Sequence, residues 1–224
     1  MKFKTTLIII LLFSFSSCKI ITALKELNRE KAKVYSYSLN DIEIKYIPMH
    51  HLGKKKFYDD VTNKIKKYKK NGFIVYYELI SPKLDIDSIQ KDLVSRKARK
   101  IIGFNGNYKE LGKGTFSEEY INQPPYEKLG ITKKDRRADV NLLQFVNECE
   151  RINGVIHLDS IDLNTDLGEK YERKGLYTDK QLKKIVVEFR NQYLINLIKS
   201  SGDDKILIIY GEGHRKDFEK RIKN

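Results

Sequence analysis

The chain has 224 residues, is 40% hydrophobic and carries a formal net charge of +14 at pH 7. This length fits one domain with a small appendage, and 14 tyrosines and 10 phenylalanines supply enough apolar surface for a sizeable core, which excludes wholesale disorder. The positive charge comes almost entirely from lysines spread along the chain, whereas nucleic-acid binders cluster basic and aromatic residues on one face. We therefore expect no nucleic-acid partner. The densest basic run, 64–70, is interpreted as a solvated helix face, and the positive surface suits anionic lipid headgroups.

The first residues have the pattern of a secretory signal. Lys2 and Lys4 precede a short apolar run, 7–13, and small residues then lead to Cys18. The run is too short to span a bilayer. The segment resembles a bacterial lipobox, in which the cysteine is acylated, for example with palmitate, although Phe15 replaces the usual leucine. The alternative is an ordinary signal peptide with an incidental cysteine.

The lipobox predicts a signal peptide over 1–17, a tether over 18–33 that begins at the lipidated Cys18, and a globular domain over 34–224. It also predicts a lipid-anchored membrane protein of the bacterial cell envelope. The other cysteine, Cys149, lies in a helix-like pattern over 140–150, and we expect it to be buried and inert. With these two cysteines, neither a disulfide framework nor a cysteine metal cluster forms.

The first half of the domain has the pattern of two strands, a helix and a third strand. We expect strands over 34–39 and 42–49 joined by a turn at Asn40-Asp41, and a helix over 57–70 closed by Asn71-Gly72. Residues 73–79 then form a buried-type strand. His51 follows the second of these strands, and Glu78 lies at the end of the third.

The second half of the domain has a long irregular stretch between its predicted helices. Residues 88–102 predict a basic helix, and 103–126 form a long irregular stretch of the kind that is often functional. Asp139 is placed in the first turn of the Cys149 helix, where acidic residues are common for helix-dipole reasons. A capping box at Thr178 opens a helix over 178–198. This helix carries Arg190 and Asn191 near its apolar face.

The last predicted strand, 206–210, is an apolar run that ends at Gly211-Glu212-Gly213-His214, just before a short polar helix over 216–222. The buried-type strands and the helices between them predict an α/β fold with a sheet covered by helices. His51, Glu78 and His214 would then gather at strand ends, where ligands of such sheets bind. Two imidazoles and a carboxylate suit a divalent metal ion, and the same groups can act without metal as general bases.

Two ordered motifs resemble the TraB/Tiki family. The first is Pro48-Met49-His50-His51-Leu52-Gly53 with the helix and the strand ending at Glu78; the second is Phe189-Arg190-Asn191 with the strand and Gly211-Glu212-Gly213-His214. The resemblance covers roughly 42–218, and Pro48 replaces the first glycine of the family's GxxH motif. It implies an erythromycin esterase/ChaN-like fold, in which ββα units build a mixed sheet flanked by helices. It also implies His51, Glu78, Arg190 and His214 as site residues, with Asp139 as a weaker candidate.

Relatives in that family hydrolyse peptides with a divalent metal, open lactones, or bind haem or peptides, so fold alone does not fix the reaction. We expect a membrane-anchored, metal-dependent hydrolase of peptidase or esterase type. In it His51, Glu78 and His214 hold the ion, Arg190 stabilises the oxyanion and Asn191 orients a peptide or small-molecule substrate. The alternatives are a non-catalytic module that binds or sequesters a peptide or haem in the same cleft, and a structural envelope lipoprotein.

Overall fold

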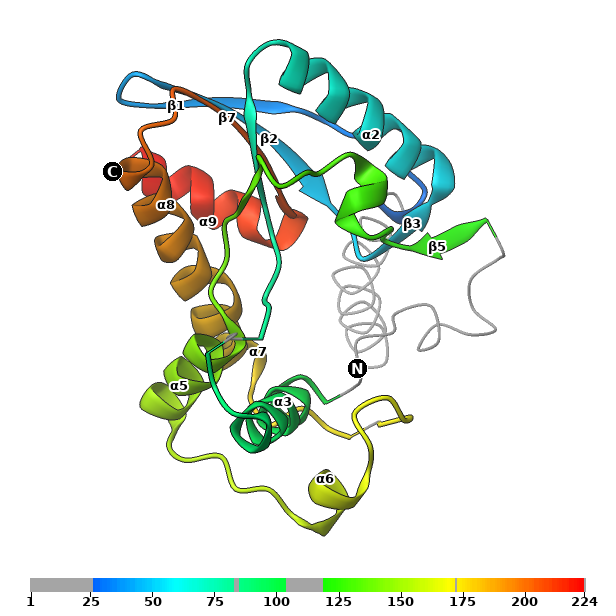
Figure 1. Cartoon of the computed structure of the whole chain (residues 1–224), viewed down its shortest axis with the longest axis vertical. Helices are drawn as coiled ribbons and strands as arrows, with labels where there is room; N and C mark the ends of the chain where they lie inside the picture. The colour runs from blue at the N-terminus through cyan, green and yellow to red at the C-terminus, as the bar shows by residue number, and fades with distance from the viewer. Residues whose placement is uncertain (1–25, 83–84, 104–118, 172, 224) are drawn as a thin grey trace, which may run out of the picture.

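The computed structural model describes residues 26–82, 85–103, 119–171 and 173–223 (Figure 1). The signal peptide, Cys18 and most of the predicted tether lie outside these residues. The strands are β1 (Tyr35–Leu39), β2 (Ile42–Met49), β3 (Leu52–Lys54), β4 (Ile74–Tyr77), β5 (Tyr120–Asn122), β6 (Arg136–Arg137) and β7 (Lys205–Gly211). The main helices are α2 (Lys55–Lys70), α3 (Ser88–Ile102), α5 (Leu142–Asn153), α8 (Arg190–Ser200) and α9 (Glu212–Ile222). The shorter helices are η1 (Tyr126–Leu129), α6 (Ser160–Asn164), α7 (Asp179–Leu182) and the π-helical η2 (Lys183–Phe189).

The predicted α/β class is confirmed: a mixed, mostly parallel five-stranded sheet runs in the order β1-β2-β7-β4-β6 and is flanked by helices. β1 and β2 form the predicted antiparallel hairpin, with Asn40 in the left-handed region at φ 52°. β2, β7, β4 and β6 are parallel, so their carboxyl ends lie at one edge of the sheet. β3 and β5 form a separate two-stranded ribbon.

The central strand β7 is buried on both faces because helices cover each side of the sheet. On one face α2 packs through Phe57, Val61 and Ile65 against Leu207 and Ile209. On the other face α8 and α9 pack against the alternate side chains of the strand (Figure 1). A third core joins α3, α5 and η2 below the sheet. The continuous apolar run of β7 is thus explained by its central place in the sheet.

Asp139 and His214 lie differently in their elements from the sequence predictions. The predicted first-turn position of Asp139 is wrong: the cap of α5 is Asn141, which forms a capping box with Gln144, and Asp139 lies before it in the segment that follows β6. The prediction that His214 precedes the last helix is also wrong, because α9 begins at Glu212 and includes His214.

The predicted long helix from Thr178 is interrupted. Its capping box at Thr178 is confirmed, but the turns between α7 and α8 are π-helical. A π-helical stretch widens the helix by one residue per turn and often accompanies functional sites. Here it ends directly before Arg190. Cys149 is buried, as predicted, and burial raises the pKa of its thiol to about 12, so the group is inert.

Among the residues that the structure describes, none belongs to a helix long and apolar enough to cross a membrane.

Candidate functional site

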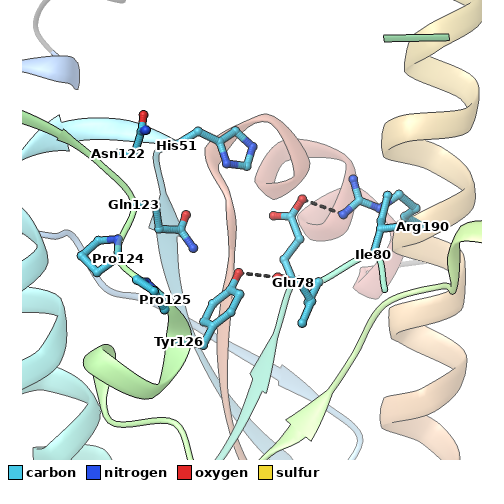
Figure 2. A pocket seen from close by; sticks show the side chains of 10 residues that line it. His51, Glu78, Ile80, Asn122, Gln123, Pro124, Pro125, Tyr126 and Arg190 are labelled. Atoms are coloured by element: carbon cyan, nitrogen blue, oxygen red, sulfur yellow. Dashed lines mark hydrogen bonds and ion pairs between the residues drawn. The ribbon is translucent and has the colours of Figure 1, made fainter. Parts of the chain in front are cut away.

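A pocket of about 450 Å³ opens at the carboxyl edge of the sheet. Figure 2 shows the segment 122–126 along one side of this pocket and Glu78 and Arg190 on the other, with His51 between them at the rim. We call this cavity the site pocket. Its size is that of a small-molecule site, and its walls combine apolar residues with a few polar groups.

Glu78 follows β4 and is held in place by its own backbone and by β7. Its N–H donates to Ile209 O at 3.0 Å, and Tyr126 Oη donates to its carbonyl oxygen. Its carboxylate accepts from Gly211 N at 2.5 Å through Oε2 and from Arg190 Nη2 at 2.6 Å through Oε1. Two of the four lone-pair positions of the carboxylate are then occupied, so Glu78 keeps the capacity to accept from a ligand.

The charge state of Glu78 follows from these partners. Its side chain is 11% exposed, and burial alone would raise its pKa, but the positive charge of Arg190 and the hydrogen bond from Gly211 lower the pKa to about 2. Glu78 is therefore ionised at neutral pH. It is also a weak base.

Arg190 lies behind Glu78 at the start of α8, with its side chain 5% exposed. Nε donates to Asp139 Oδ1 at 2.9 Å, and Nη2 donates to Asp139 Oδ2 at 2.5 Å as well as to Glu78. Nη1 faces Val186 O at 3.4 Å and His214 Nε2 at 3.3 Å. A guanidinium has five N–H groups, so each of them is engaged in this arrangement.

Asp139 is fully buried and pairs with Arg190 in bidentate geometry, with its Oδ1 also accepting from Val140 N at 2.9 Å. A buried ion pair is weak evidence for stability, because the desolvation of both charges opposes the attraction between them. Glu78 and Asp139 together carry one more charge than Arg190. The cluster of these three residues is thus net negative within a strongly basic chain.

His214 is buried beside this cluster, in the first turn of α9. Its Nδ1 lies 3.0 Å from Asn191 Oδ1, while Asn191 Nδ2 donates to His214 O and to Asp217 Oδ2, both at 2.9 Å. Since Asn191 Oδ1 can only accept, Nδ1 carries the proton and Nε2 accepts from Arg190. Burial lowers the pKa of His214 to about 4, so its ring is neutral at pH 7.

The structure therefore brings together most of the residues that the sequence singled out. Glu78, Arg190, Asp139 and His214 form one hydrogen-bonded cluster, and Asn191 is fully buried behind it, where it orients His214 and does not line the site pocket. His51 is exposed and lines the pocket from the turn between β2 and β3.

The residues predicted to hold a metal ion do not fit one in this arrangement. Arg190 donates to Glu78 and faces His214 Nε2, so a guanidinium takes the position of a cation between these two ligands. Over the described ranges, no group of three or more His, Cys, Asp or Glu side chains is placed to hold one ion. A divalent ion stays a prediction that requires Arg190 to move. Haem binding in the same cleft also stays a prediction.

Sequence reasoning missed the opposite wall of the site pocket, Asn122 to Tyr126. Gln123 N donates to His51 O at 2.8 Å, which continues the pairing of β3 with β5 and places the wall beside His51. The signal in the sequence is two consecutive prolines between amide side chains and a tyrosine, inside a stretch already recognised as irregular.

Comparison of the chain with protein-family models, curated proteins and solved structures finds no match. The resemblance to the TraB/Tiki family therefore stays a prediction.

Proposed function

We propose that the chain is a hydrolase that cleaves an ester or peptide bond held in the site pocket between His51 and Glu78. The observation that carries the proposal is an ionised carboxylate, fixed by a fully engaged buried arginine, across an open pocket from an exposed imidazole (Figure 2). An ionisable group in a cleft whose pKa is strongly shifted is a candidate for a functional site, and Glu78 is such a group.

His51 is the general base of this proposal, because an imidazole at the pocket rim can take a proton from an attacking water. Glu78, with a pKa of about 2, accepts a hydrogen bond from that water and stabilises the imidazolium that forms. Gln123 points into the pocket from the opposite wall, and its amide supplies the N–H donor for the developing oxyanion (Figure 2).

Arg190 acts as a positioning residue in this scheme. Its N–H groups are directed at Asp139, Glu78, Val186 and His214, so a direct bond to an oxyanion would require one of these contacts to be given up. Its role is to hold Glu78 ionised and pointed into the pocket. This differs from the oxyanion role that the sequence suggested for it.

The proposed hydrolase is tethered to the bacterial envelope membrane through a lipidated Cys18. The lipobox-like sequence supports this part of the proposal. Mass spectrometry of the membrane-extracted chain tests it: the mature N-terminus should be an acylated Cys18, whereas an intact Met1 would contradict it.

The catalytic proposal is tested with p-nitrophenyl esters and fluorogenic peptides as substrates. We expect turnover by the wild type to fall at least about 100-fold in His51→Gln, the scale of a lost general base. Glu78→Gln should also lose activity, and His157→Gln, at an exposed histidine outside the pocket, should keep it. Equal activity in His51→Gln and wild type would refute the assignment. Metal analysis of the same samples decides whether an ion accompanies activity.

A second candidate is a binding module that uses the same pocket for a peptide. The low pKa of Glu78 favours this candidate, because a carboxylate with a pKa of about 2 binds cationic or N–H groups well and removes protons poorly. Binding of a peptide without turnover of any ester or peptide in the panel would support it over the hydrolase.

A further inference from the structure

A second cavity of about 490 Å³ lies beside the site pocket, on the α2 side of the wall formed by 122–125. We call it the α2 pocket. Helix α2 lines it with Lys55, Tyr58, Asp59 and Thr62, and Lys128 of η1 also lines it. The two cavities share four of the five wall residues, 122–125, so a ligand long enough to cross this part of the wall would reach both.

The shared wall is held at both ends. On one side Gln123 N donates to His51 O at 2.8 Å, and on the other Lys128 N donates to Pro125 O at 2.9 Å. Tyr126, the next residue, donates to the carbonyl oxygen of Glu78. Pro124 and Pro125 have no backbone N–H. This part of the wall therefore offers a ligand apolar surface and carbonyl acceptors.

The charge of the α2 pocket differs from that of the site pocket. Lys55 and Asp59 neutralise each other in an ion pair at 2.7 Å. Lys128 is exposed and, within the described part of the chain, forms no ion pair, so the α2 pocket has one cationic charge in excess. The cluster of Glu78, Arg190 and Asp139 behind the site pocket is net negative by one charge.

One hydrogen bond joins the lining of the α2 pocket to the turn that precedes His51. Tyr58 lines the pocket from α2, and its hydroxyl donates at 2.8 Å to the carbonyl oxygen of His50, the residue before His51. The buried Tyr58 thus links α2 to the turn that carries the proposed general base.

We propose that the α2 pocket is a second subsite of the same substrate, and that this substrate is an elongated peptide with an acidic group that binds at Lys128. The proposal rests on the proposed function, because it places the scissile bond of the peptide in the site pocket. The acidic end of the peptide then lies on the other side of the wall segment 122–125.

The test uses two fluorescein-labelled hexapeptides, Ala-Ala-Ala-Ala-Asp-Asp and Ala-Ala-Ala-Ala-Asn-Asn, both amidated, and the full chain. Fluorescence anisotropy measures their Kd for wild type, Lys128→Glu and the matched control Lys134→Glu, whose exposed lysine lines neither pocket. We expect wild type to prefer the acidic peptide roughly three- to fivefold, the scale of one exposed ion pair. The preference should vanish or reverse in Lys128→Glu and persist in Lys134→Glu.

Three outcomes would overturn the inference: no acidic preference in wild type, an unchanged preference in Lys128→Glu, or an equal loss in both variants. Turnover of p-nitrophenyl acetate, which is small enough for the site pocket alone, separates the two proposals. An acidic preference that depends on Lys128 without any turnover supports the subsite and contradicts the hydrolase. Turnover without the preference contradicts the subsite and supports the hydrolase.

Discussion

Replacing Arg190 by methionine should destabilise the protein strongly at neutral pH. The change removes the partner of a fully buried Asp139 and of Glu78, whose side chain is 11% exposed, so two carboxylates stay buried without a counter-charge. Breaking a buried ion pair from one side costs about 3–5 kcal/mol. This is a large part of the total stability of a typical domain, about 5–15 kcal/mol. Arg151→Met is the matched control, because its pair with Glu148 is exposed, and it should cost less than about 1 kcal/mol.

The effect should also depend on pH. In Arg190→Met the pKa of Glu78 loses the lowering effect of Arg190 while burial still raises it, so Glu78 can take up a proton in the folded state. The difference in unfolding free energy from wild type should therefore shrink between pH 7 and pH 5. Urea unfolding followed by circular dichroism at both pH values measures it. A loss no larger than that of Arg151→Met, or a loss that is the same at both pH values, would refute the idea that Arg190 is the counter-charge of the cluster.

Three further predictions concern the neighbours of this cluster. The folded-state pKa of His214, about 4, lies below its ordinary value of 6.5, so the contribution of His214 to stability is complete above pH 6.5 and is lost as the pH falls to 4. In His214→Gln the free energy of unfolding in urea should therefore vary less between pH 6.5 and pH 4 than in wild type. Asn191→Leu should cost about 2–3 kcal/mol in the same assay, because it leaves the buried Nδ1–H of His214 without an acceptor. Gly211→Ala should lower turnover more than stability, since its new Cβ would lie 3.1 Å from Glu78 Oε2 and displace the carboxylate; unchanged turnover would contradict this placement.

Much of the fold could be predicted because its signals are local. The apolar run of β7, the amphipathic spacing of α2 and the turn at Asn40 each follow from short-range pattern, and each is present as expected. Boundaries were less predictable. The last helix was predicted to begin at residue 216, after His214, but it begins about one turn earlier, at Glu212. Neither helix propensity nor the apolar pattern decides between these two starts.

The composition of the site was predictable in part. Strand ends identified His51, Glu78 and His214, because parallel strands bring their carboxyl ends to one edge, whereas Arg190 came from the resemblance to the TraB/Tiki family. The role of Arg190 could not be predicted, since it depends on which five acceptors surround the guanidinium in space. Asp139 shows the same limit: helix-dipole reasoning placed it at a helix start, whereas tertiary packing buries it against Arg190.

The wall formed by 122–126 lay beyond sequence reasoning for a different reason. Its place is set by the pairing of β5 with β3, which is distant in the sequence. Both strands are too short to show an alternation of apolar and polar residues that would predict them. The π-helical turns before Arg190 likewise have no reliable sequence signature. Both features shape the pocket. Both become visible only in three dimensions.

The central claim is that His51 and Glu78 act together on a ligand in the site pocket. The most direct measurement is the turnover of the ester and peptide panel by wild type, His51→Gln, Glu78→Gln and the double variant, each assayed with and without a chelator. The claim predicts that each single change removes most of the activity and that the double variant is little worse than either. The chelator series shows whether an ion accompanies the activity. Activity that survives both substitutions would contradict the claim.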